Sequence, residues 1–276
     1  MTNRPVSTMR YAPAFFRNQN IRQSATAAAI FIALTAGSAW AADPESWGEA
    51  EMEEFEEFTV FIEICGTDED AGIKGLLGGE PWRRATVSGP DGQSIYRFGP
   101  KLGDVGSGTV FWESAEPSFV DLPLDEFLDR FPEGEYTASG TKVGGGRLGS
   151  MAVLTHNLPA GPVITSHEDE EVVEFTGENL VVTWEEVTED FRGGPLRSEI
   201  IGYIMTVTFE TEILGETVQR ELTIDVIPPS TFSAEIPADF LEPDTEVQIE
   251  VAAREESGNR TSKEVFINVV DDLPNF

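Results

Sequence analysis

Apolar and polar residues alternate over long stretches in the last third of this chain. The alternation is clearest in LVVTW (180–184), IIGYIMTVTF (200–209) and VQIEVAA (247–253). Side chains at positions i, i+2 and i+4 of a strand point to one face, so each segment can cover one side of a hydrophobic core. Because Gly, Pro, Asn and Asp separate the segments, the pattern predicts an all-β fold built from packed sheets, a β-sandwich.

The first half of the chain shows the same alternation, interrupted by one predicted helix at 123–131. In LPLDEFLDRFP the apolar residues recur at i, i+3, i+4 and i+7, and prolines flank the segment at both ends. The strands predicted around it are FTVFIEIC, RRATVS, QSIYRF, GTVFWES, EYTASGTKV and RLGSMAVLTH. The chain therefore reads as two β-sandwich-like domains, of which the first contains a short helix.

The C-terminal third resembles a fibronectin type III domain over about residues 178–270. The resemblance is carried by Trp184 in LVVTWEEV, Tyr203 in IIGYIMTV, and the segments FSAEIP, LEPDTEVQIEVAA and ESGNRTS. It implies a seven-stranded sandwich, related to the immunoglobulin fold, with Trp184 and Tyr203 in the core. It also implies a turn before the sixth strand at Leu241-x-Pro243-x-Thr245. Domains of this family serve as spacers or as binding modules, and the fold does not decide between them.

One position departs from that family. Val247 stands where the family usually carries the aromatic residue of the tyrosine corner, so this chain lacks that hydroxyl-to-backbone bond. The N-terminal half, over EFLDRFPEGEYTASG and LTHNLPAGPVI, resembles uncharacterised secreted bacterial proteins that pair a β-rich unit with a type III module. That second resemblance implies no activity.

The first 41 residues are predicted to be a cleaved signal peptide. Four arginines and no acidic residue precede the apolar run ATAAAIFIALTAGSA, and Ala39-Trp40-Ala41 offers small residues at the cleavage positions. The apolar run is too short to span a bilayer comfortably. We therefore expect an exported protein, periplasmic or extracellular, that is not inserted in the membrane after cleavage. Translation can begin at Met1 or at Met9.

The charge of the chain excludes one class of partner. The whole chain carries 18 basic and 50 acidic residues, a formal charge of −32. Since four of the basic residues and none of the acidic ones precede Ala42, the remainder has 14 basic residues and a formal charge of −36. Such a field repels phosphate backbones, so we expect no nucleic-acid binding.

These features divide the chain into a signal peptide (1–41), an acidic lead-in (42–57), a β-rich domain (58–158), a linker (159–176) and a fibronectin type III-like domain (177–271). Cys65 is the single cysteine, so the chain has no intramolecular disulfide. It is either a small core or edge residue, or it pairs with another chain.

The search for chemistry finds no catalytic motif. The G-x-G-x-x-G match at 144–149 precedes a strand-like segment instead of a helix, which indicates a hairpin. His156 and His167 lack partners at metal-ligand spacing. We expect a protein without a cofactor. The alternative is a secreted hydrolase of polysaccharide, with an unidentified carboxylate site in the first domain and a groove lined by Trp82 and Trp112.

One loop is a candidate calcium site. Asp68, Glu69 and Asp70 lie between Gly66 and Gly72, directly after a predicted strand, and Ca²⁺ prefers such hard oxygen ligands. The competing interpretation is a charged turn.

The function predicted from these observations is that of an exported, non-catalytic protein whose sandwich loops bind a protein or a glycan, as a binding, adhesion or structural module. Two loops are candidate contact surfaces, and they compete with a reading as solvated turns. Their residues are Ser257, Gly258, Asn259 and Arg260 in one loop, and Phe191 and Arg192 in the other.

Overall fold

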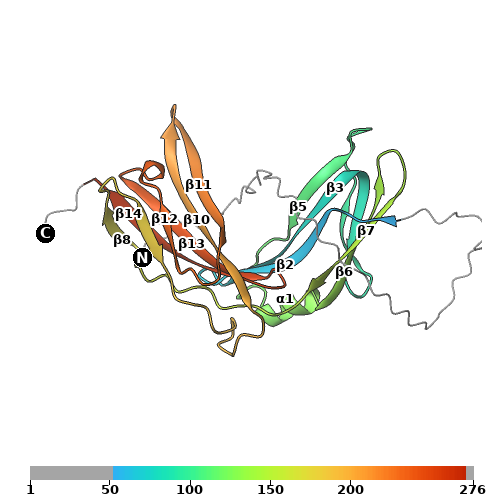
Figure 1. Cartoon of the computed structure of the whole chain (residues 1–276), viewed down its shortest axis with the longest axis horizontal. Helices are drawn as coiled ribbons and strands as arrows, with labels where there is room; N and C mark the ends of the chain where they lie inside the picture. The colour runs from blue at the N-terminus through green and yellow to red at the C-terminus, as the bar shows by residue number, and fades with distance from the viewer. Residues whose placement is uncertain (1–51, 272–276) are drawn as a thin grey trace, which may run out of the picture. The chain divides into compact units, whose positions relative to one another are not determined.

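The computed structural model describes residues 52–271 and confirms a mainly β fold (Figure 1). The predicted signal peptide and most of the acidic lead-in lie outside the described residues. The elements of the N-terminal half, residues 52–158, are β1 (Met52–Glu53), β2 (Glu57–Cys65), β3 (Asp70–Ser88), β4 (Ser94–Phe98), β5 (Ser107–Glu113), α1 (Leu124–Arg130), β6 (Gly134–Lys142) and β7 (Arg147–Leu154). Those of the C-terminal half, residues 159–271, are β8 (Glu171–Glu174), β9 (Leu180–Thr183), β10 (Ile200–Ile213), β11 (Glu216–Ile227), β12 (Ser233–Ile236), a short 3₁₀ helix (Ala238–Phe240), β13 (Thr245–Glu255) and β14 (Arg260–Val270).

Strand β3 organises the N-terminal half because it serves two sets of neighbours. Its first part pairs with β2 and β5, and its second part pairs with β4 and β6. The sequence predicted only the second part as a strand, because the first part is rich in glycine, which disfavours strands. Gly75 is needed there: a Cβ at this position would lie 2.2 Å from the ring of Trp112. The predicted helix is confirmed as α1, which buries Phe127 and Leu128.

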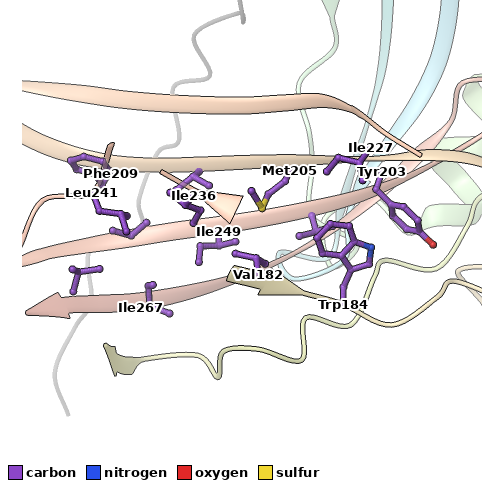
Figure 2. Packing of buried hydrophobic residues seen from close by; sticks show 14 of the residues in the cluster. Val182, Trp184, Tyr203, Met205, Phe209, Ile227, Ile236, Leu241, Ile249 and Ile267 are labelled. Atoms are coloured by element: carbon purple, nitrogen blue, oxygen red, sulfur yellow. The ribbon is translucent and has the colours of Figure 1, made fainter. Parts of the chain in front are cut away.

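The C-terminal half is a sandwich of two sheets. One sheet has the order β8-β14-β13-β10-β11, and β9 pairs with β12 in a second sheet. Alternate residues of both sheets form one core, as the sequence pattern predicts, and Figure 2 shows Val182 and Ile236 of the small sheet beside Met205 and Ile249 of the large one. Each of these four side chains is fully buried.

The two residues expected in the core of that sandwich lie there. Trp184 and Tyr203 are both buried, and their ring centroids are 5.5 Å apart. Thr245 begins β13, and its hydroxyl donates to the carbonyl of Glu242, 2.6 Å away, which fixes the turn before that strand. Val247 is fully buried, so a small apolar side chain fills the place of the family's aromatic residue.

Strand pairing also connects the two halves. Residues 260–262 of β14 pair in parallel with residues 63–65 of β2, so one continuous sheet runs through both halves. Strand β8, which lies inside the predicted linker, pairs with the other end of β14. The place where β2 and the loop after it meet β14 is called the junction below.

Candidate functional site at the junction of β2 and β14

Five charged side chains meet at the junction and are called the junction cluster: Glu63, Lys74, Glu113, Glu116 and Arg260. The Nζ of Lys74 contacts Glu63 and lies 2.9 Å from Oε1 of Glu116 and 3.7 Å from Oε2 of Glu113. Its side chain is only 3% exposed. Glu63 also contacts Arg260, so one carboxylate of β2 links a cation of β3 to a cation of β14.

Residues 66–67, which follow β2, are joined to β14 by one backbone–backbone hydrogen bond and two that involve side chains. The N–H of Gly66 donates to the carbonyl of Ser262, 2.9 Å away. The Nζ of Lys263 lies 2.5 Å from the carbonyl of Gly66. The N–H of Glu264 donates to Oγ1 of Thr67, 3.0 Å away. The turn between β2 and β3 is therefore attached to β14 over several consecutive residues.

The electrostatics of this region follow from its burial. Burial alone raises the pKa of Glu63, but Arg260 and Lys74 outweigh it and hold that pKa below its usual value. The pKa of Lys74 is raised, because Glu63 and Glu116 more than offset the burial that lowers it. Burial raises the pKa of Glu116. The cluster is thus a network of three carboxylates around two cations and not a single activated acid or base.

Glu250 of β13 lies outside this cluster. Burial raises its pKa to about 8, and the nearby Glu63 and Glu264 add to the shift. Arg260 and Lys74 act in the opposite direction without cancelling it. Glu264 lies directly opposite Glu250 in the β13–β14 ladder, and like charges at such positions repel each other. Its surroundings therefore favour the protonated form of Glu250.

Glu250→Gln is expected to stabilise the protein at pH 8 by roughly 1–3 kcal/mol and to change little at pH 4. The folded state binds a proton with a pKa of about 8, against the ordinary value of 4.5, so the wild type loses stability as pH rises between these values. The measurement is urea unfolding at pH 4, 6 and 8. Glu246→Gln, an exposed position on the same strand, is the control, and parallel pH profiles for wild type and E250Q would refute the assignment.

The first predicted contact loop is part of the junction. Asn259 is fully buried. Its Oδ1 accepts the N–H of Ile62 at 2.8 Å, and its Nδ2 lies 2.9 Å from the carbonyl of Thr155 and 3.2 Å from that of Asn157. Asn259 therefore binds three segments of the chain together and is not available to a ligand.

The rest of this loop is occupied in the same way. Ser257 is half-buried, and its Oγ lies 2.6 Å from Oγ1 of Thr155. Gly258 has a φ of 100°, a conformation that side chains rarely adopt, so the tight turn requires glycine. The guanidinium of Arg260 pairs with Glu63 and stacks 4.7 Å from the ring centroid of Phe61. The sequence presents this loop as a solvated turn, and the structure packs it against β2 and residues 155–157.

The second predicted contact loop also packs within the chain. Phe191 packs edge-on against Phe119, with ring centroids 5.8 Å apart, and its N–H donates to the carbonyl of Leu158. Arg192 pairs with Asp125 of α1 on the surface. A cavity of about 220 Å³ lies beside this loop. Its walls include Leu128, Leu158 and Leu196, with Glu133, His156 and Arg197.

The residues that would support hydrolysis do not form a groove. Trp82 and Trp112 are both buried, and they belong to separate core clusters. His156 is held by its environment, since Nε2 lies 2.8 Å from the carbonyl of Phe131. His167 pairs with Glu171 at 3.3 Å. In the described residues, neither histidine lies against a hydroxyl or thiol that it could activate.

The predicted calcium loop is a tight turn, and only one of its three acidic residues joins a group of potential ligands. The Sγ of Cys65 and one carboxylate oxygen each of Asp68 and Glu264 lie within 4.8 Å of one another. Glu69 has a φ of 54°, and its carbonyl accepts the N–H of Phe119. Burial, together with Glu116 and Asp68, raises the pKa of Asp70 to about 6.

Cys65 is a half-buried free thiol at the end of β2. Burial raises its pKa to about 12, and the N–H of Asp68 points to its Sγ at 3.5 Å. A thiol with this pKa stays protonated at neutral pH and is a poor nucleophile and a poor metal ligand.

Sequence reasoning missed the junction cluster, although one signal was present. Lys74 is a lone charge inside AGIKGLL, where apolar and glycine residues surround it on both sides. A charge in such a run is buried and therefore requires partners. The carboxylate partners of Lys74 come from β2, the end of β5 and the segment after β5, and Arg260 of β14 joins through Glu63, so the cluster leaves no local pattern.

The comparisons with known proteins match by structure only: no family model and no curated protein matches this chain. A biofilm associated protein, over its BSP domain, is 17% identical, covers 79% of this chain and 30% of its own, with a TM-score of 0.24. The FN1–FN3 domains of chicken CNTN1 are 11% identical, with 79% and 65% covered and a TM-score of 0.27. A tetra-tandem repeat from the extending region of a large adhesion protein is 13% identical, with 78% and 50% covered and a TM-score of 0.25.

The chain thus spans less than two thirds of each of these three structures. Superpositions at such TM-scores assign neither a family nor a function. In residues 52–271, no helix is long and apolar enough to cross a membrane.

Proposed function

We propose that this protein is an exported, non-catalytic binding or structural module that contacts a protein or a glycan. The observation that carries the proposal is the distribution of its polar chemistry. Largely buried ions and amides of the described residues bind the two β-rich halves to each other, as Glu63, Arg260 and Asn259 do at the junction. Side chains committed to such contacts hold a scaffold together, and a scaffold acts through its outer surface.

The proposal is tested with the chain from Ala42 onward, immobilised and exposed to envelope extract and to a glycan array. We expect specific retention of a protein or a glycan. The same preparation is assayed for release of sugars from polysaccharides and of peptides from protein substrates. Turnover that Glu63→Gln or Glu116→Gln abolishes, while Glu135→Gln on the exposed face of β6 leaves it intact, would establish the alternative, a hydrolase.

Calcium binding at the loop of residues 66–72 is a second part of the proposal. Millimolar Ca²⁺ is expected to raise the melting temperature of the chain by about 2–5 °C, because a ligand of the folded state stabilises it. Asp68→Asn combined with Asp70→Asn should remove the shift, whereas Asp129→Asn on the exposed side of α1 should keep it. An unchanged melting temperature, or a shift that survives the double substitution, would dispose of this site.

The calcium effect should also depend on pH. Asp70 has a pKa raised to about 6, so it is charged above that pH and neutral below it. A shift that involves Asp70 is therefore larger at pH 7.5 than at pH 5.

A further inference from the structure

The hairpin of β10 and β11 extends past the sheet that supports it. Strand β13 pairs with β10 as far as Phe209, whereas β11 continues to pair with β10 as far as Ile213. Residues 210–219 are therefore a two-stranded ribbon without a third strand in the described part of the chain. In Figure 1 the tip of this ribbon stands clear of the labelled strands.

The core ends before the ribbon does. Thr211 donates to one oxygen of Glu242 at 2.6 Å, and Arg220 donates to the other at 2.7 Å. Arg220 also lies over the ring of Phe209, 5.3 Å from its centroid, and closes this end of the sandwich. Beyond this closure the same face of the ribbon continues with apolar side chains.

Those apolar side chains are Ile213, Leu214 and Val218. Ile213 is 50% exposed, Val218 is 38% exposed and Leu214 is fully exposed. Ile213 follows Phe209 at even spacing and Val218 lies opposite Thr211, so both share the face that is buried further down. Val120 is an exposed valine in a turn outside the strands, whereas these three residues lie together at the end of one hairpin.

Leu214 is also an unfavourable choice for its backbone position. Leu214 and Gly215 have φ values of 56° and 84°, as in a type I′ turn, where Asn and Gly are the preferred residues. A leucine in the left-handed region is strained, and full exposure gives it no burial in return. A partner that buries the side chain removes the cost of exposure and offsets the backbone strain.

The charge around the tip selects the kind of partner. Residues 210–219 include Glu210, Glu212 and Glu216, all exposed, and contain no Lys, Arg or aromatic residue. Glycans are held by stacking on aromatic rings, and anionic lipid surfaces repel carboxylates, so neither fits. A second copy of this chain, with a formal charge of −32 in full length, is repelled as well.

We propose that the hairpin tip docks into an apolar pocket of another protein whose rim carries Lys and Arg. The inference rests on the proposed binding function and names its surface and the chemistry of its partner. Leu214 would fill the pocket, with Ile213 and Val218 against its wall. The three glutamates would lie opposite the basic rim, where they speed and orient the encounter.

The first test places a photo-crosslinking amino acid at position 214 of the full chain, in the cells that produce it, and at position 120 as the control. Val120 is 88% exposed and lies outside the hairpin. We expect one dominant protein adduct from position 214 and none from position 120. No adduct, or an adduct with a glycan, a lipid or a second copy of the chain, would overturn the proposal.

An adduct does not suffice, so its protein is purified and its Kd measured against three variants. Leu214→Asn, and separately Glu212→Lys with Glu216→Lys, should each raise the Kd by roughly tenfold or more, and Val120→Asn should not. Leu214→Asn should also leave the melting temperature unchanged or raise it, because Asn suits the turn. Equal Kd values, or a lower melting temperature for L214N, would show that Leu214 serves the stability of the fold and not binding. A partner crosslinked from position 120 alone would overturn this surface and leave the binding function standing.

Discussion

Replacing Lys74 with methionine is expected to lower the free energy of unfolding by about 3–5 kcal/mol at pH 8. The side chain of Lys74 is only 3% exposed, and it faces Glu63, Glu113 and Glu116. Methionine has a similar length and retains the packing of the aliphatic stem, but it leaves these carboxylates without their shared cation. Breaking a buried ion pair from one side costs more than the pair contributes as a whole, because the remaining charges stay desolvated.

The same loss should shrink to about half at pH 5. The pKa of Glu116 is already raised by burial, and removing Lys74 raises it further, so lower pH neutralises the carboxylates that the substitution exposes to each other. Urea unfolding at both pH values measures the difference. Lys101→Met, at an exposed position, is the control and should stay within about 0.5 kcal/mol of wild type. An equal loss of unfolding free energy at pH 5 and pH 8 would mean that the substitution acts through packing and not through charge.

A companion substitution separates the ion pair from its desolvation. Lys74→Met combined with Glu116→Gln removes one charge of each sign and leaves Glu63 paired with Arg260, and it is expected to recover part of the lost stability at pH 8. Failure to recover would indicate that the hydrogen bonds of this cluster are specific to the ionised groups.

The fold could be predicted where one strand face meets a core. In β2 the alternation places Val60, Ile62 and Ile64 on one side, and all three are buried as expected. The same alternation leaves Phe61, Glu63 and Cys65 on the other side, and it does not say which residues meet them. In the structure β14 pairs with the edge of β2, and its Arg260 reaches this side, where it pairs with Glu63 and lies over the ring of Phe61. A period of two reports which residues share a face, and it does not report what covers the second face.

The loops were harder to predict, because the same residue types serve exposed and buried turns. ESGNRTS has the composition of a solvated turn, yet its Asn259 is fully buried. Asparagine favours turns because its amide bonds to nearby backbone groups, and that ability serves equally well for backbone groups far away in sequence. The contact partners at residues 62 and 155–157 come from the other half, so no local signal connects them.

The tip of the β10–β11 hairpin differs from these loops, because its sequence carries a local signal that the prediction of contact surfaces did not use. ILGE in a hairpin turn places a leucine at a position where most chains carry asparagine. Within the sequence alone this is an irregularity. Its meaning depends on the register, because only the register shows that β13 stops at Phe209 and that the apolar face beyond it is uncovered.

Asn259→Ala is expected to cost about 3–5 kcal/mol of folding free energy, a large share of the stability of an ordinary domain. Alanine removes the acceptor for the N–H of Ile62 and the donor for the carbonyls of Thr155 and Asn157, and each group left unpaired in the interior costs about 1–3 kcal/mol. Asn179→Ala is a matched control, because that side chain also makes two hydrogen bonds, to Glu235 and to the N–H of Ala238, but on the surface. Water replaces the bonds of Asn179, so its loss should stay below about 1 kcal/mol. Denaturant unfolding of both variants decides the matter: similar losses would show that water reaches the Asn259 site and that its amide does not hold the two halves together.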